Sequence, residues 1–153
     1  MKTYHKCLQS ASIAETFGIT KDPTSNYMIV MKYYENGNLY QYLDRSNGIL
    51  LWKDIIDILW GIAEGLEKIH AEGKVHRNIH GGNILVDEKA VTDSRVSDVG
   101  FYGPCCYYDK DETLNQIYGV LPYVAPEVLR GDNYTTASDI YSFGIIMNTF
   151  ASG

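Results

Sequence analysis

The residues most able to do chemistry lie between positions 76 and 100. The run His76-Arg77-Asn78-Ile79-His80-Gly81-Gly82-Asn83 is rich in polar side chains, and Asp98 follows fifteen residues after Asn83. Asn83 and Asp98 both carry hard oxygen donors. The amide of Asn78 can accept a hydrogen bond, but it cannot be a useful base. Taken alone, such a segment leaves the role of these side chains open, and Asp98 could be a plain turn aspartate before Gly100.

The clearest element that could position this segment is a helix from Trp52 to about Ala71. Its apolar residues recur every three or four positions, as on a helix that faces a core. Gly73 is a natural C-terminal stop. At the other end, Leu50 and Leu51 have no side-chain oxygen for an N-cap, so we expect water or tertiary contacts to satisfy the first turn.

Two kinds of shorter element precede this helix. The β-rich runs Phe17–Thr20 and Tyr27–Tyr33 flank residues 21–26, whose Pro, Asp, Ser and Asn supply turn chemistry. That arrangement predicts a β-hairpin. A polar turn then leads to Leu39–Leu43, where the spacing of the apolar residues predicts a short helix.

Beyond the long helix, residues 74–100 alternate two β-type runs with glycine and polar residues, as a loop-rich sheet fragment would. The two runs are Asn83–Val86 and Arg95–Ser97. A long irregular stretch then precedes a second helix, which begins near Ala137 and runs through Phe150. Thr136 can cap this helix, with Asp139 three residues on as the reciprocal acid.

Composition and charge exclude several classes of function. The 153 residues are 45% hydrophobic and 21% charged, as in an ordinary globular protein, and the formal net charge is −6. Negative charge argues against nucleic acid as a partner. No apolar stretch is long enough for a membrane span. The three cysteines are odd in number and lack zinc-site spacing, which favours reduced thiols and a cytoplasmic location.

Three motifs, in order along the chain, resemble those of eukaryotic protein kinases. They are the run His76–Leu85, similar to the catalytic loop His-Arg-Asp-Leu-x-x-x-x-Asn; Asp98-Val99-Gly100, similar to Asp-Phe-Gly; and Ala125-Pro126-Glu127, which matches Ala-Pro-Glu. A hinge-like run, Met28–Tyr34, and the run Ser138–Gly144 extend the resemblance over nearly the whole chain. Residues Gly119–Glu127 look closer to serine/threonine kinases, whereas His80 suggests the tyrosine-kinase-like branch.

The resemblance implies an α+β, protein-kinase-like fold. Residues 1–30 would be a remnant of the small β lobe, and residues 31–153 would form the hinge and a partial, mainly helical C-lobe through the helix that contains Asp139. The chain is expected to begin too late for the Gly-rich loop and its lysine, and to stop before the family's final helices. We therefore expect an exposed apolar face on the last helix, formed by Ile140, Phe143, Ile146, Met147 and Phe150.

The resemblance also implies ATP and magnesium as cofactors. Asp98 would bind an ion that bridges the β and γ phosphates, and Asn83 would hold a second ion. The residues assigned to the nucleotide are Met31, Lys32, Tyr33, Tyr34, Leu85 and Ser97. Among them Met31 would lie at the back of the adenine pocket and Leu85 on its floor, although a buried strand alone would explain Met31 equally well.

Asn78 stands where the family has its catalytic aspartate, and the loss of such a group typically costs about 10²- to 10⁴-fold in rate. Complete relatives transfer phosphate from ATP to serine, threonine or tyrosine of a protein substrate. This chain is expected to be inactive or very weak. One alternative is a pseudokinase-like module that binds a regulatory protein partner. Another is a truncated fragment without function.

The remaining expectations concern residues around this site. By resemblance, His76 packs with Val99 and bonds to the backbone, and Asp139 ties down the catalytic loop. Val120 replaces a threonine, and His80 replaces a lysine that many relatives use near the transferred phosphate. Possible phosphorylation sites, which could equally be a plain tyrosine-rich surface loop, are Tyr102, Tyr107, Tyr108, Thr113 and Tyr118.

Overall fold

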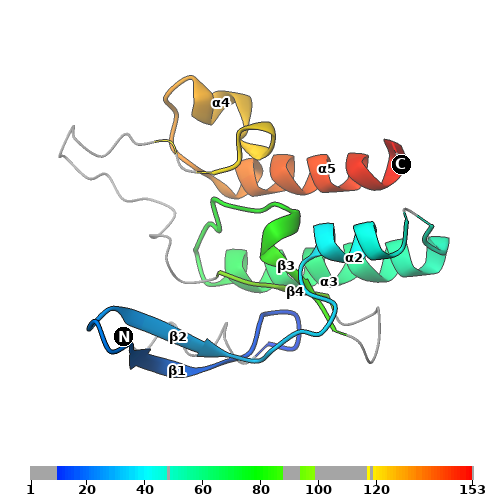
Figure 1. Ribbon diagram of the computed structural model, residues 1–153. Coiled ribbons are helices and arrows are strands. Elements are labelled where there is room, and N and C mark those ends of the chain that lie inside the picture. The colour runs from blue at the N-terminus through cyan, green and yellow to red at the C-terminus, as the bar shows by residue number, and fades with distance from the viewer. Residues whose placement is uncertain (1–9, 48, 88–93, 99–116, 118, 153) are drawn as a thin grey trace.

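The computed structural model describes residues 10–47, 49–87, 94–98, 117 and 119–152, and its elements lie in three tiers (Figure 1). A hairpin forms one tier, a small sheet with two helices forms the middle, and two further helices form the last. In chain order the elements are β1 Thr16–Lys21, β2 Tyr27–Met31, α2 Leu39–Arg45, α3 Trp52–Ala71, a 3-10 helix Gly81–Asn83, β3 Ile84–Val86, β4 Ser94–Val96, a 3-10 helix Leu121–Tyr123, α4 Pro126–Leu129 and α5 Thr136–Ser152.

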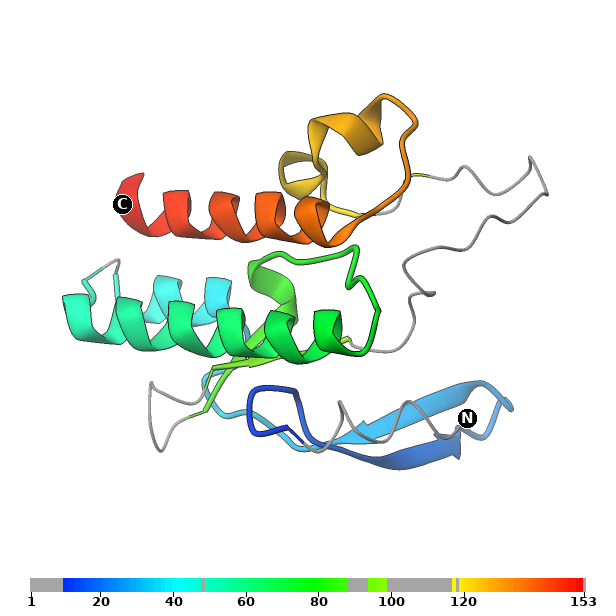
Figure 2. The ribbon, with the colours of Figure 1, turned by 180° about the vertical axis from the view of Figure 1, so that it is seen from behind.

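The core lies between α3, the β3–β4 pair and α5. Ile58, Ile62 and Leu66 of α3 are buried there, and Ile146 of α5 joins them. Figure 2 shows from behind that α5 lies beside α3 and runs in the opposite direction. Burying each such side chain contributes about 1.5–3 kcal/mol. This core therefore fixes the helices that carry the candidate site.

Helix α3 spans Trp52–Ala71, and this confirms the helix expected from the apolar spacing. Leu51 gives no side-chain cap, and Gly73, with a φ of +66°, follows the last turn, both as expected. Gly61 and Gly65 let the helix approach β4 closely. A Cβ added at Gly65 would lie 2.6 Å from Cγ2 of Val96, so only glycine fits without movement.

The hairpin β1–β2 forms at the expected place and is antiparallel. Its turn is closed by Asp22, whose carboxylate accepts hydrogen bonds from the backbone N–H groups of Thr24 and Asn26 at 2.9 and 2.8 Å. The second strand ends at Met31 rather than at Tyr33, because the backbone turns away there toward α2. Both faces of the hairpin are largely exposed.

Two boundaries differ from those expected near the middle sheet. Helix α2 extends to Arg45, and Asn38 and Gln41 form a capping box at its start. Asn83 belongs to a 3-10 helix and not to a strand, because its N–H is bound to the carbonyl of His80 at 2.9 Å. The second run is displaced by one residue and pairs Ser94–Val96 with β3.

Two expectations for α5 are wrong. Its cap is Thr135, which exchanges hydrogen bonds with Ser138, so neither Thr136 nor Asp139 caps the helix. The expected exposed face is only partly exposed. Ile146 is 1% exposed, and Phe143 and Phe150 pack against the core, because α3 covers this side of the helix. Ile140 and Met147 are exposed as expected.

The fold is thus mixed α+β, with two small sheets and packed helices. The division into residues 1–30 and 31–153 stays a prediction, as does the cytoplasmic location. In the described parts of the chain, no helix is long and apolar enough to cross a membrane. Val99, Gly100 and the five possible phosphorylation sites at positions 102–118 lie outside the described residues.

Candidate functional site

The loop of residues 76–83 is anchored to α5 by Asp139. This buried carboxylate accepts hydrogen bonds from the backbone N–H groups of His76 and Arg77, each at 2.8 Å. His70 of α3 contacts the same carboxylate at 2.8 Å. Arg77 has a φ of +69°, a left-handed conformation that costs energy for a residue with a side chain, and Asp139 holds it in place. The expected structural role of Asp139 in tying down the loop is therefore confirmed.

His76 connects the loop to the end of β4. Its ring is 1% exposed, and Nε2 lies 2.8 Å from the carbonyl oxygen of Ser97. Nδ1 accepts a hydrogen bond from the N–H of Asn78, so Nε2 must be the nitrogen that carries the proton. Burial lowers the pKa of His76, which keeps the ring neutral. The expected bond from His76 to the backbone is confirmed, whereas its contact with Val99 lies outside the described residues.

Asn83 and Asp98 are brought together through Ser97. The carbonyl oxygen of Asn83 accepts from both the N–H and the hydroxyl of Ser97, at 2.8 and 2.9 Å. Asp98 is the next residue, is exposed and has a φ of +64°. The backbones of Asn83 and Asp98, the two expected cation ligands, are therefore linked through the hydrogen bonds that Ser97 donates to Asn83.

The orientation of the Asn83 side chain suits a cation. Its amide nitrogen donates to the carbonyl oxygen of Asn78 at 2.9 Å, which leaves the amide oxygen Oδ1 on the opposite side of the group. In the described part of the chain, no cluster of three or more His, Cys, Asp or Glu side chains could hold a metal ion. One amide and one carboxylate fit magnesium bound largely through water and phosphate oxygens.

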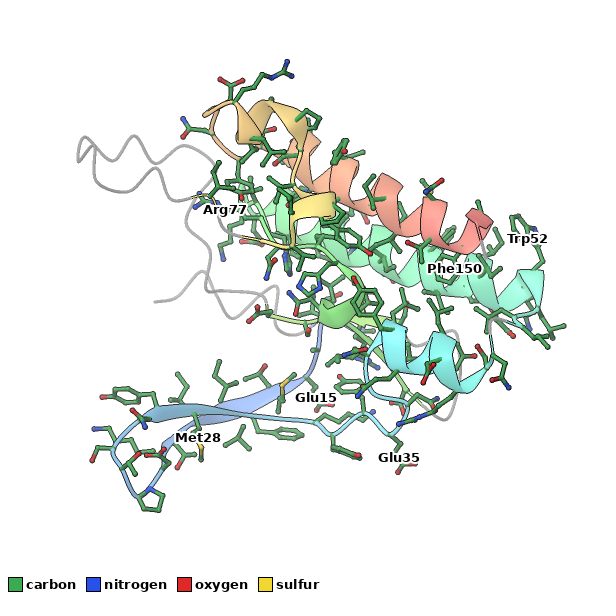
Figure 3. The ribbon with its side chains drawn as sticks, turned by 45° about the horizontal axis from the view of Figure 1, so that its top comes forward. Glu15, Met28, Glu35, Trp52, Arg77 and Phe150 are labelled. Carbon is green, nitrogen blue, oxygen red and sulfur yellow. The ribbon has the colours of Figure 1, made fainter. Side chains whose placement is uncertain are left out.

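Asn78 lies between His76 and the segment that precedes α4. A Cβ added at Gly119, whose φ is +131°, would lie 3.6 Å from Oδ1 of Asn78. Gly119 and the neighbouring Val120 are both exposed. Figure 3 shows Arg77, the residue before Asn78, where the loop faces the α4 region. An amide with a buried oxygen, not a carboxylate, thus stands at this place in the loop.

The residues assigned to the adenine lie where β2 leads into α2. Met31 ends β2, Tyr33 is 82% exposed, and the buried Tyr34 accepts a hydrogen bond from the N–H of Glu15 at 3.1 Å. The N–H of Lys32 donates to the carbonyl of Glu15 at 2.9 Å, so this group is already committed. Figure 3 shows Glu15 at the base of the hairpin.

Leu85, the expected floor of the adenine pocket, lies in the middle of β3. It is half-buried and pairs with Arg95 on one side and with Asn38 on the other. Asn38 follows the hinge by four residues. The pairing of Leu85 with Asn38 therefore joins the expected floor of the adenine pocket to the segment that follows the hinge.

Sequence reasoning missed an aromatic cluster over the loop. The hydroxyl of Tyr40 on α2 donates to that of Tyr123 at 2.9 Å, and the ring of His80 lies 6.5 and 6.1 Å from those two rings. Burial and the bond to Tyr123 raise the pKa of Tyr40 to about 12. A Cβ at Gly81 would lie 2.6 Å from the Tyr40 ring, so glycine is needed here. In the sequence, the glycine pair Gly81-Gly82 was the feature that could have indicated a close contact at this place.

Known proteins similar to this chain are protein kinases. The chain matches the protein kinase domain family over residues 2–153. It is 32% identical over 129 residues to a probable serine/threonine-protein kinase of Dictyostelium discoideum, covering 84% of this chain and 8% of that protein. It is 36% identical over 126 residues to a probable receptor-like protein kinase of Arabidopsis thaliana, covering 78% and 25%. It is also 35% identical over 131 residues to the Arabidopsis cysteine-rich receptor-like protein kinase 1, covering 82% and 21%.

Proposed function

This chain belongs to the protein kinase family, and on that premise we propose that it binds magnesium and an adenine nucleotide but transfers phosphate only very slowly. The chain spans only 8 to 25% of the length of the three relatives described above. The activity of a whole protein is therefore part of the proposal. The proposal concerns the site formed by residues 31–34, 76–85 and 97–98.

The support for nucleotide binding comes from the placement of oxygen donors. Asn83 and Asp98 would hold magnesium, and Ser97 fixes their spacing through its two hydrogen bonds to Asn83. The bound ion would neutralise charge on the phosphates. At the other end, the half-buried Leu85 and the backbone beyond Met31 would receive the adenine. Tyr34 would supply a backbone N–H at this edge, since that of Lys32 is bound to Glu15.

The support for slow transfer is a single observation at Asn78. The loop around it is held by Asp139 and by the ring of His76, so the backbone has the fixed geometry that positioning requires. The side chain at this place is an amide, which can orient a substrate hydroxyl but cannot take its proton. Nor can His80 replace it through Nδ1, because this atom accepts the N–H of Gly82 at 3.1 Å.

A second candidate function is a pseudokinase-like module that binds a regulatory protein. The observation that favours it is an exposed apolar stripe on α3, formed by Trp52, Ile56 and Trp60. These residues are four positions apart and so share one face of the helix. Large exposed apolar patches often mark protein interaction sites. This function is compatible with nucleotide binding, because the stripe and the loop involve different residues.

The test is nucleotide binding followed by transfer. Mg·ATP is expected to raise the melting temperature of the purified chain, and Asn83→Ala is expected to remove the magnesium-dependent part of that shift. Transfer of labelled phosphate to a general protein substrate is expected to be near background, and Asn78→Asp is expected to raise it about 100-fold. An unchanged melting temperature in the presence of Mg·ATP would contradict the proposed nucleotide binding. Rapid phosphate transfer by the unaltered chain would contradict the proposed slow transfer.

A further inference from the structure

Lys32 makes an ion pair that crosses from the hinge to the middle sheet. Its ammonium group contacts the carboxylate of Asp87, which follows the last residue of β3, 55 positions away. Asp87 is 8% exposed, and about a third of the Lys32 side chain is exposed. The same ammonium lies 5.2 Å from the centre of the Tyr34 ring. The pair is thus shielded from solvent on the Asp87 side and supported by an aromatic face.

Neutral hydrogen bonds continue the connection beyond Lys32. The amide of Asn36 donates to the carbonyl oxygen of Asp87 at 3.1 Å, and the N–H of Val86 donates to the carbonyl of Gly37 at 3.0 Å. The segment 32–37 is therefore bound to the end of β3 at three points. Of these, only the Lys32 contact is ionic, and it is the one nearest to the expected adenine edge.

The opposite side of the segment is bound to the hairpin. Lys32 donates through its N–H to Glu15, and Glu15 donates through its N–H to the hydroxyl of Tyr34. The hinge is thus held between the hairpin and β3. Leu85 lies in β3, two residues before Asp87, so the ion pair is one of the contacts that hold the hinge beside that strand.

We propose that the Lys32–Asp87 ion pair positions the hinge for the adenine, so that nucleotide affinity in this chain depends on it. The inference rests on the proposed nucleotide binding and adds a positioning residue to it. Its effect should fall on the adenine end of the ligand, because the pair lies beside the hinge and on the far side of Leu85 from Asn83. Loss of the pair should therefore weaken adenosine, ADP and ATP equally.

A second cation, Arg95, lies near Lys32. Arg95, opposite Leu85 in the β3–β4 pair, is close enough to act on the pKa of Lys32, although the hydrogen bond to Asp87 is the main influence and raises it. Arg95 belongs to β4, so it leaves a positive charge close to this pair when Lys32 is replaced. Removing the Lys32 ammonium should thus release the hinge while leaving the β3–β4 pair folded.

The experiment compares Lys32→Met, Lys32→Arg and Asp87→Asn in the 153-residue chain. Lys21→Met is the matched control, because Lys21 also lies over a tyrosine ring, that of Tyr27 at 4.6 Å, but at the far end of the hairpin. Affinity for adenosine, ADP and ATP is measured by calorimetry. The Gly37 amide donates to Tyr34 of the hinge and the Val86 amide donates to Gly37, so their hydrogen exchange reports on how the hinge is held to β3; the Val96 amide, bound to Ser12, is the internal reference.

Lys32→Met and Asp87→Asn are each expected to weaken all three ligands about three- to tenfold, with the double variant no weaker than either. Lys32→Arg is expected to stay within about twofold of the parent, and Lys21→Met to be unchanged. Exchange at Gly37 and Val86 should speed up several-fold in Lys32→Met, with Val96 unaffected.

Two outcomes would overturn the proposal. One is an unchanged affinity for Lys32→Met in a chain that binds nucleotide. The other is unchanged exchange at Gly37 and Val86, which rejects the positioning role even if the parent chain binds no nucleotide at all. Absence of nucleotide binding by the parent chain would instead contradict the proposed function. In that case, faster exchange at Gly37 and Val86 in Lys32→Met would still show that Lys32 positions the hinge.

Discussion

Asp139 on α5 accepts a hydrogen bond at 2.8 Å from the backbone N–H of Arg77, which lies 62 positions earlier in the chain. The bond holds Arg77 at a positive φ and sets the direction in which the loop leaves α3. The residue after Arg77 is Asn78, where the family has its base. The helix that carries Asp139 thus fixes the place of the substituted residue, although it contributes no group to the chemistry.

Replacing Asp139 with alanine is expected to destabilise the chain by about 3–5 kcal/mol. The change would leave the buried N–H groups of His76 and Arg77 without their acceptor and would remove the contact with His70. Urea denaturation of the variant measures the loss. Asp44→Ala, at an exposed position of α2, is the control and should change stability by no more than about 0.5 kcal/mol. A loss below 1 kcal/mol for Asp139→Ala would show that the loop is held by other contacts.

The sequence predicted those elements whose signal is local. Helix α3 repeats its apolar pattern over 20 residues, and the hairpin has Asp22 and Pro23 at its turn. The cap of α5 was misplaced because Thr135 and Thr136 are adjacent residues with the same hydroxyl, and local chemistry does not distinguish them. Local spacing predicted Asp139 as a capping acid, because its partners lie more than sixty residues away, whereas the resemblance to the protein kinase family predicted that it ties down the loop.

In the candidate site, too, features with a local sequence signal were predicted and features set by tertiary contacts were not. The placement of Asn83 and Asp98 follows from motif spacing, and the structure joins them through Ser97. The hydrogen bond between Tyr40 and Tyr123 links residues 83 positions apart, and no pattern in the sequence around either tyrosine indicates it. Burial of Ile146 likewise depends on which face α3 covers. Tertiary partners decide such features, so sequence periodicity alone cannot.

Two helical glycines should respond to alanine in opposite directions. A Cβ at Gly61 of α3 would lie 2.6 Å from the backbone oxygen of Ser94, so Gly61→Ala is expected to cost about 1–3 kcal/mol. A Cβ at Gly144 of α5 meets no atom within 4 Å, so Gly144→Ala should stabilise the chain by about 0.5–1 kcal/mol through helix propensity. Urea denaturation of both variants tests the pair. A stabilising effect of Gly61→Ala would mean that α3 packs on β4 more loosely than described, and a destabilising effect of Gly144→Ala would mean that the space around Gly144 is not open.

Gly81→Ala is expected to act through Tyr40. The new Cβ would lie 2.6 Å from Cε1 of the ring and would push it away from Tyr123, at a cost of about 1–2 kcal/mol. In a Tyr40→Ala background the same change should cost less than about 0.5 kcal/mol, since the obstructing ring is gone. A double-mutant cycle in urea measures this coupling. Tyr33→Ala, at an exposed side chain, is the control and should show no coupling with Gly81→Ala.

Acid is expected to destabilise the chain through His76 and His80. Burial, as the main cause, lowers the pKa of both histidines in the folded state below the ordinary value of 6.5. Below that value the unfolded chain binds protons that the folded chain does not, so the free energy of unfolding falls as pH drops. Each ring also accepts a backbone N–H at Nδ1, from Asn78 and Gly82 respectively, and protonation there would turn an acceptor into a donor.

The stability contributed by the neutral rings is therefore present above the unfolded-state pKa of about 6.5 and is lost as pH falls from there through the lowered pKa of each ring in the folded state. The slope is at most about 1.4 kcal/mol per pH unit for each histidine, and His80 contributes less because it is only half-buried. Urea denaturation at pH 8, 7, 6 and 5.5 measures this slope. His76→Gln keeps a donor for Ser97 but does not titrate, so it should flatten the curve, whereas Lys21→Met should leave it unchanged. If the unaltered chain is equally stable at pH 8 and pH 5.5, the buried rings do not titrate with folding as their surroundings require.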